Sequence, residues 1–422
     1  MKVEERLVPS PDVDVLPAPI ASIDPPEPGL TPEQMIARAA AMRADLRAAQ
    51  AETERRGNIS PEINARFIDN GFYRVVQPRF FGGYEFDVAT YVRLVMEVAR
   101  GCPESAWVLS LTSGHTRQFA TFPIEGQAMA YGSTGEFRAP EVTAPPGRAV
   151  AVEGGYRISG TWDYASGSAV STHILVVAIV GTGASNENEP IMALIPRADF
   201  QIVKNWQVFG MQGTGSDRVV VDDIFVPASL TRPAFATEGP NPLLPDRRYI
   251  GSPLYFGPYR SFVIAESAAV VVGAAEGALD CYEEDFRARK GSFAVRQARH
   301  ELPEYQFNFG RCRALVDTAK AALLHTAAQY MAVGAAALAG EAVDPEADRR
   351  MAMIEQQAIH LAWDAVDIIF RTIGSSAAKS DSTLGRFWRN IGVLRGHLAH
   401  QSDTVALNYG RVHFGHPQVG PF

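Results

Sequence analysis

A serine, a tryptophan and a few histidines are the residues of this sequence whose types and surroundings suit ligand chemistry. Ser166 precedes Gly167 where an alternating strand pattern gives way to a turn, and glycine there lets the backbone approach a ligand closely. The Ser166 hydroxyl can then hydrogen-bond that ligand. A Ser-Gly pair taken alone more often only caps a turn, so both interpretations stay open.

Trp107 and His115 lie on one expected helical stretch, residues 104–121, at a spacing that lets both face one pocket. The indole of Trp107 offers an apolar wall for a flat ring, and a core position is equally compatible with its type. His115 can hydrogen-bond a ligand, or it can be a partly buried histidine that bonds a backbone carbonyl.

The last expected helix carries a mainly polar stripe with two histidines in an otherwise apolar bundle. The stripe consists of Arg386, Asn390, Val393, His397, His400 and Thr404 at helical spacing. Such a stripe is usually a solvated face, but two histidines favour a pocket or a subunit contact. A neutral imidazole at His397 can accept a proton, with a pKa expected near neutral pH.

Metal and nucleotide motifs are missing from the sequence. The histidine pairs 397/400 and 413/416 have no Cys or Glu ligands at useful spacing, so we predict no metal site. There is no Walker loop and no strand-linked GxGxxG. In the run Gly213-Thr214-Gly215-Ser216, Thr214 and Ser216 could offer hydroxyls and amides to a cofactor, although a plain β turn is the default interpretation.

The elements that must position these residues form four segments. Residues 1–30 contain seven prolines and predict a disordered or extended arm. Residues 31–140 predict a helical domain, opened by a Thr31 to Gln34 capping box. Residues 141–250 predict an antiparallel sheet with strands at 148–152, 156–164, 173–180, 191–195 and 218–225, and residues 251–422 predict a four-helix bundle. The expected fold class is α+β.

Composition excludes several classes of protein. A net charge of -8 without basic runs argues against a nucleic-acid partner, and the apolar stretches look too interrupted to span a membrane. We therefore expect a cytoplasmic protein. Three widely spaced cysteines fit neither a disulfide framework nor a metal motif.

Four motifs, taken in order, resemble a known family. They are Gly-Cys-Pro-Glu-Ser-Ala-Trp-Val at 101–108 with His115, Gly-Gly-Tyr-Arg-Ile-Ser-Gly-Thr-Trp at 154–162 leading to Ser166, Gly-Thr-Gly-Ser at 213–216, and Arg-Phe-Trp-Arg-Asn at 386–390 leading to His397. Helices, then a sheet, then a bundle is the order of the acyl-CoA dehydrogenase fold. The motifs are similar to its two-component flavin monooxygenases, such as 4-hydroxyphenylacetate hydroxylase and dibenzothiophene monooxygenase.

The resemblance implies a monooxygenase that hydroxylates a small phenol-like or polycyclic aromatic through a flavin C4a-hydroperoxide. It implies reduced FMN or FAD as cofactor, molecular oxygen as co-substrate, a separate NAD(P)H flavin reductase and a homotetramer. It also implies site roles. His397, His115 and Ser166 would be catalytic; Ser166, Trp107, Trp162, Thr214, Ser216 and Arg260 would bind flavin, with Ser166 at the flavin N5; and His115, His397 and His400 would bind substrate.

Two other functions remain open from the sequence. An acyl-CoA dehydrogenase with tightly bound FAD needs a carboxylate base, which Glu266 could supply, although no glutamate follows Glu355 and residues 131–146 lack a Thr-Glu-Pro motif. A catalytically inactive ligand-binding scaffold would use the same residues only for packing. Within the oxygenase hypothesis, attack at carbon, nitrogen or sulfur stays undecided.

Overall fold

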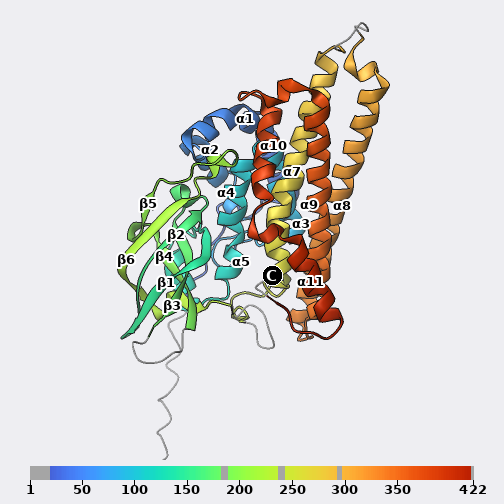
Figure 1. The fold of residues 1–422 in the computed structure, drawn as a ribbon. Coiled ribbons are helices and arrows are strands. Elements are labelled where there is room, and N and C mark those ends of the chain that lie inside the picture. Colours follow the sequence, from blue (N-terminus) through green and yellow to red (C-terminus); the bar gives the residue numbers. More distant parts are fainter. Residues whose placement is uncertain (1–19, 182–188, 236–242, 292–296, 420–422) are drawn as a thin grey trace, which may run out of the picture.

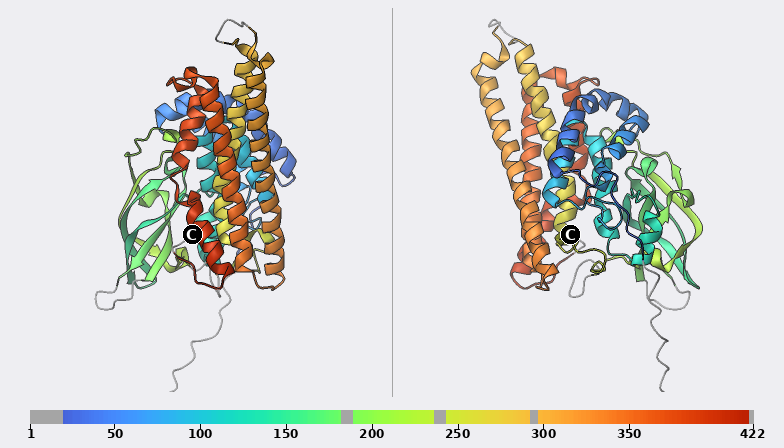
Figure 2. Two further views of the ribbon diagram at one scale, coloured as in Figure 1. Left: turned by 45° about the vertical axis from the view of Figure 1, so that its right-hand side comes forward. Right: turned by 180° about the vertical axis from the view of Figure 1, so that it is seen from behind.

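The computed structural model describes residues 20–181, 189–235, 243–291 and 297–419. Helix α4 lies between a β-sheet on one side and a long helical bundle on the other (Figures 1 and 2). The predicted α+β class is confirmed, with an N-terminal helical part, a central sheet and a C-terminal bundle.

The N-terminal part is helical, as predicted. Its helices are α1 (Pro32–Arg56), α2 (Pro61–Asp69), α3 (Val88–Gly101), α4 (Pro103–Gly114), α5 (Thr116–Phe119) and α6 (Ile124–Tyr131). Both hydrogen bonds of the capping box at Thr31 and Gln34 are present. The single helix expected over 104–121 is wrong, because it breaks at His115 between α4 and α5. Trp107 and His115 therefore do not share one continuous helix.

The sheet has the strand order β5-β6-β2-β1-β3-β4-β7. Its strands are β1 (Glu141–Val152), β2 (Gly155–Ala165), β3 (His173–Val180), β4 (Glu189–Pro196), β5 (Gln201–Val203), β6 (Asp217–Pro227) and β7 (Thr231–Pro233). The five predicted strands are confirmed, but β1 starts seven residues early and the short edge strands β5 and β7 were missed. One pair, β1 with β3, is parallel, so the sheet is not purely antiparallel.

The C-terminal part contains the long helices. They are α7 (Tyr259–Ala288), α8 (Pro303–Leu338), α9 (Pro345–Ile373), α10 (Thr383–Leu394) and α11 (Ser402–His413). The expected continuous last helix is wrong, because α10 ends at Leu394 and His397 has an extended backbone. Gly396 explains the break in part, since glycine weakens a helix, and the Nδ1 atom of His397 accepts a hydrogen bond from the amide of Ala399 at 3.2 Å.

The expected arm, residues 1–30, is partly ordered. Residues 1–19 lie outside the described part of the chain, but Ile23 forms a β-bridge with Phe81 and Leu30 is buried in the core. Glu27 also pairs with Arg38 of α1 at 2.8 Å. The disordered alternative is therefore wrong for residues 23–30, which are non-helical and pack on the N-terminal part.

The expectation that the apolar stretches are too interrupted to span a membrane does not hold for two helices. By length and composition alone, α7 and α8 could each cross a membrane. In α7, 94% of the most apolar window is buried inside the protein, which is typical of a core helix. In α8 only 28% of the corresponding window is buried, so this helix leaves an apolar surface uncovered by its own chain.

Candidate active site

The turn after β2 carries Ser166 onto helix α4. Gly167 follows Ser166 with φ 77°, a conformation that favours glycine. Its amide donates to the carbonyl of Thr214 at 2.9 Å, and a Cβ atom at this position would lie 3.0 Å from Val108 and Thr112 of α4. The glycine therefore lets the strand end pack closely against the helix that carries Trp107.

Four of the predicted site residues form one row of hydrogen bonds, which we call the hydroxyl chain. The Trp107 indole Nε1 donates to Ser166 Oγ at 3.1 Å, and Ser166 Oγ lies 2.7 Å from Ser216 Oγ. Ser216 Oγ lies 2.6 Å from Thr214 Oγ1, which donates to the carbonyl of Met211 at 2.8 Å. The structure thus brings together Trp107, Ser166 and the pair Thr214 and Ser216, which come from three separate segments of the sequence.

The loop that supplies Thr214 and Ser216 is fixed by side chains of distant helices. The Gly213 amide donates to Glu104 Oε1 of α4 at 2.8 Å, and the Met211 amide donates to Asn390 Oδ1 of α10 at 2.7 Å. Burial raises the pKa of Glu104 to about 7, although the bond from Gly213 lowers it. Glu104 belongs to the motif at 101–108, but its role was not predicted.

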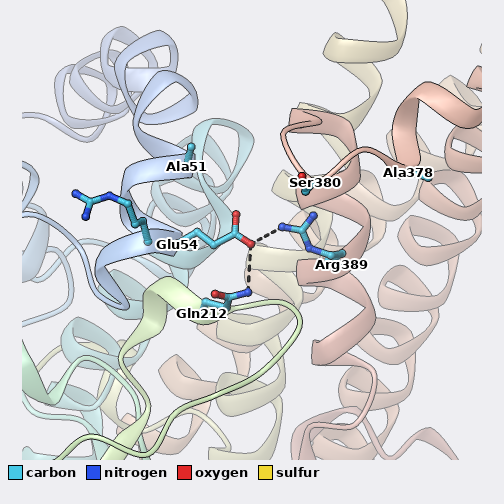
Figure 3. Close-up of a pocket in the computed structure, with 7 residues that line it drawn as sticks. Ala51, Glu54, Gln212, Ala378, Ser380 and Arg389 are labelled. Atoms are coloured by element: carbon cyan, nitrogen blue, oxygen red, sulfur yellow. Dashed lines mark hydrogen bonds and ion pairs between the residues drawn. The ribbon is translucent and has the colours of Figure 1, made fainter.

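An open pocket of about 560 Å³ lies beside this loop (Figure 3). Glu54 of α1 pairs with Arg389 of α10 there, and the Gln212 amide donates to Glu54 at 3.3 Å. The lining residues are Ala51, Glu54, Arg55, Gln212, Ala378, Ser380 and Arg389. None of them is a predicted catalytic residue, so the pocket borders the loop rather than the hydroxyl chain. Glu54 gave no signal in the sequence because its partners lie more than 150 residues away.

His397 faces the same tryptophan from the C-terminal part. Its ring lies 4.9 Å from the Trp107 ring at 82°, and 5.7 Å from the ring of His400. Loss of solvent lowers the pKa of both histidines, to about 3 for the buried His400. His397 lies in the exposed segment 395–398, so solvent must reduce this effect on its own pKa. For His397 the shift is away from the near-neutral pKa expected from the sequence.

His115 lies in a second polar cluster. Its Nδ1 lies 2.9 Å from the carbonyl of Ala139, so Nδ1 carries the proton and Nε2 is the acceptor. Nε2 lies 3.8 Å from Glu266 Oε1, and Tyr91 donates to the other carboxyl oxygen at 3.3 Å. Burial raises the pKa of Glu266 well above its usual range, and the nearby Glu141 raises it further. Burial therefore favours the neutral acid form of Glu266.

Two predicted flavin-binding residues lie outside both clusters. Trp162 is fully buried in the sheet core, where its indole donates to the Val177 carbonyl at 3.1 Å. Arg260 is buried in the bundle at 3.8 Å from Asp348 of α9. Neither is included in the site we propose below. A buried arginine that faces another helix cannot be recognised from one sequence.

Exposed aromatic residues beside Ser166 were not predicted. Tyr164 is 67% exposed and has φ 67°, an uncommon conformation for a bulky residue. Its ring lies 5.9 Å from that of Trp206, whose indole donates to the Met211 carbonyl at 2.8 Å. Phe209, in the same loop as Trp206, is 60% exposed. The position of Tyr164 two residues before Ser166 is the sequence signal that could have assigned it to the site.

A search of the described residues for three or more His, Cys, Asp or Glu side chains placed to hold a metal ion finds no such group. The predicted absence of a metal therefore stays a prediction.

Family profiles match both helical parts of the chain. The acyl-CoA dehydrogenase N-terminal domain matches residues 31–131, and the acyl-CoA dehydrogenase C-terminal domain matches residues 265–402, together more than half of the chain.

Related proteins extend the match over almost the full length. The chain is 29% identical to the flavin-dependent monooxygenase oxygenase subunit HsaA of Rhodococcus jostii, over 89% of this chain and 97% of that protein. It is also 29% identical to the FADH(2)-dependent resorcinol hydroxylase oxygenase component of a Rhizobium species, over 94% and 98%. The crystal structure of 3-HSA hydroxylase from Rhodococcus superposes with a TM-score of 0.84 at 28% identity, over 92% of this chain and 98% of that one. The chain therefore belongs to the acyl-CoA dehydrogenase family and, within it, to the oxygenase components of two-component flavin-dependent monooxygenases.

Proposed function

We propose that this protein hydroxylates a small, phenol-like aromatic compound with reduced flavin and molecular oxygen. The observation that carries the proposal is the meeting of Trp107, Ser166 and His397, which come from the helical part, the sheet and the bundle. The names of the related oxygenase components support reduced flavin and an aromatic substrate. Delivery of flavin by a separate NAD(P)H reductase, a homotetrameric state and a cytoplasmic location are parts of the same proposal.

The residues around Ser166 fit a flavin. Exposed Tyr164 and half-buried Trp206 offer flat rings, and Ser166 offers a hydroxyl at the strand end, backed by Ser216 and Thr214. When bound, the reduced flavin supplies two electrons and activates oxygen. In our proposal Ser166 contacts the flavin N5, and the indole of Trp107 forms one wall of the site. FMN and FAD are both compatible with these contacts.

His397 is the proposed acid-base group. It lies in the exposed segment 395–398, and what burial its ring has lowers its pKa, which favours the neutral imidazole at pH 7. Nδ1 of His397 accepts from the Ala399 amide, so Nε2 of the neutral ring carries the proton and can donate to a phenol oxygen. In our proposal Nδ1 gives up this contact when substrate binds, and the imidazole then takes the proton of the phenol, which makes the aromatic ring more electron-rich for oxygen transfer. His400 lies behind it and orients it through ring contact. His115, whose Nε2 is an acceptor 3.8 Å from Glu266 Oε1, is a second proposed contact for a substrate hydroxyl.

The test uses the protein with chemically reduced FMN or FAD, oxygen, and a panel of phenols, indoles and thiophenes. We expect a hydroxylated phenol, and a loss of about 10²–10⁴-fold in rate for His397→Ala with flavin binding retained. The proposal fails if no compound of the panel is oxygenated while reduced flavin binds and is oxidised.

A dehydrogenase function has one observation in its favour, the buried carboxyl of Glu266 on α7. A base must be ionised, whereas burial raises the pKa of Glu266 and so favours its protonated form. The family relationship also favours the oxygenase. Acyl-CoA thioesters with a dye acceptor would reveal this activity by reducing the dye.

A further inference from the structure

The hydroxyl chain beside Trp107 has a fixed direction. The Met211 carbonyl also accepts from the Trp206 indole and the Thr214 amide, but it has no proton of its own, so the 2.8 Å contact between its oxygen and Thr214 Oγ1 requires the single proton of Thr214. Thr214 Oγ1 then has only lone pairs for Ser216, so Ser216 donates to Thr214 and in turn accepts from Ser166. The indole of Trp107 can only donate to Ser166. All four contacts are satisfied only when each proton points away from Trp107.

The reverse direction would leave a close contact without a proton. If Thr214 donated to Ser216 instead, its oxygen would face the Met211 carbonyl oxygen at 2.8 Å with lone pairs on both sides. All three hydroxyls are buried, so no bulk water can compensate. The direction is therefore a property of the folded chain before any ligand binds.

We propose that this directed chain makes Ser166 a hydrogen-bond acceptor toward the flavin and thereby selects the reduced flavin over the oxidised one. The inference rests on the proposed placement of Ser166 at N5. Reduced flavin carries a hydrogen on N5, whereas oxidised flavin presents a lone pair there. The Ser166 oxygen has two lone pairs, of which Trp107 uses one, so the other accepts from N5–H. With oxidised flavin, the Ser166 oxygen and N5 would both be hydrogen-bond acceptors, so no proton would lie between them.

Ser216 and Thr214 are thus positioning residues for oxidation-state selectivity. An acceptor facing an acceptor in a buried site weakens binding about ten- to a hundredfold. Removing the hydroxyl of Ser216 frees the Ser166 proton to turn toward N5, which would favour oxidised flavin. Thr214→Val has the same consequence, because Ser216 loses its acceptor and can donate to Ser166 instead. The Ser166 proton is then free to turn toward N5. Thr214→Ser keeps the chain intact.

The experiment measures dissociation constants of FMN and FAD, oxidised and anaerobically reduced, for each variant. We expect the parent to bind reduced flavin about ten- to a hundredfold more tightly. Ser216→Ala and Thr214→Val should each reduce that ratio about tenfold, and Thr214→Ser should preserve it. Ser171→Ala is the matched control, because this buried hydroxyl of the same turn bonds only the Ser168 carbonyl. If the parent has equal affinity for both oxidation states, or if the ratio survives both disruptive variants, the inference is wrong.

A neutron structure of the deuterium-exchanged, flavin-free protein tests the direction independently of function. We expect the deuterium of Ser166 on the line to Ser216 Oγ and that of Thr214 on the line to the Met211 carbonyl. Deuterium on Ser216 pointing to Ser166 would overturn the inference. A protein with the expected deuterium positions that binds neither flavin would contradict the proposed function and, with it, the role of the chain in selectivity.

Discussion

His400 shows how the interior of the bundle controls a titrating group. It is 4% exposed, its Nδ1 lies 2.7 Å from the Leu394 carbonyl, and burial lowers its pKa to about 3 from 6.5. Because the folded pKa is lowered, the unfolded chain binds the proton more readily, so stability is lost as pH falls from about 6.5 toward 3. We expect His400→Gln to flatten this part of the pH dependence of the free energy of unfolding. Urea unfolding at several pH values measures the free energy of unfolding. If this free energy changed with pH equally in parent and variant, the lowered pKa of His400 would be contradicted.

Glu266 has the opposite pH dependence. Its raised pKa means that the folded state holds the proton, so its contribution is full below pH 4.5 and is lost as pH rises. We expect Glu266→Gln, which keeps the size and stays neutral, to raise the free energy of unfolding at pH 8 by about 1–3 kcal/mol and to have little effect at pH 4. The exposed Glu341→Gln is the control. A variant that gains no stability relative to the parent between pH 4 and pH 8 would contradict the raised pKa of Glu266.

At the scale of elements, local signals were sufficient for most of the fold. The capping box at Thr31 and the alternating strand patterns depend on neighbours in the sequence, so they could be predicted. The break of the last helix after Leu394 was missed although Gly396 is a local signal, whereas the contact between His397 and Trp107 joins distant parts of the chain and could not be predicted. The three-residue edge strands β5 and β7 are too short to show alternation. Ser166 and His397 were singled out by motif, whereas Glu104 and Glu54 act through contacts across the fold.

The hydrogen bond between Glu104 of α4 and the Gly213 amide in the loop before β6 can be tested directly. Glu104→Ala removes the acceptor of the buried Gly213 amide, and we expect it to lower the free energy of unfolding by about 1–3 kcal/mol. Glu104→Gln keeps a carbonyl acceptor at that place, so we expect a clearly smaller loss. Chemical denaturation of both variants measures the difference. Equal losses would mean that packing, and not this hydrogen bond, holds the loop.

At the scale of the whole molecule, α8 presents an uncovered face. One side of the helix packs with Cys312, Val316, Leu323 and Tyr330 against the bundle, while alanines recur every seventh residue on the exposed side. They are Ala314, Ala321, Ala328 and Ala335. Small residues at this spacing allow close packing of a second helix, and the proposed homotetramer would supply one.

Ala328→Glu places a charge on that face without entering the core of the subunit, since Ala328 is exposed. We expect the parent to be a tetramer by light scattering and the variant to dissociate to smaller species, because burying an unpaired carboxylate in a subunit contact is costly. Ala37→Glu, an exposed alanine of α1, should leave the assembly intact. Circular dichroism should show a folded subunit in both variants. A monomeric parent would contradict the tetramer, and a tetrameric Ala328→Glu would exclude the alanine face of α8 from its interfaces.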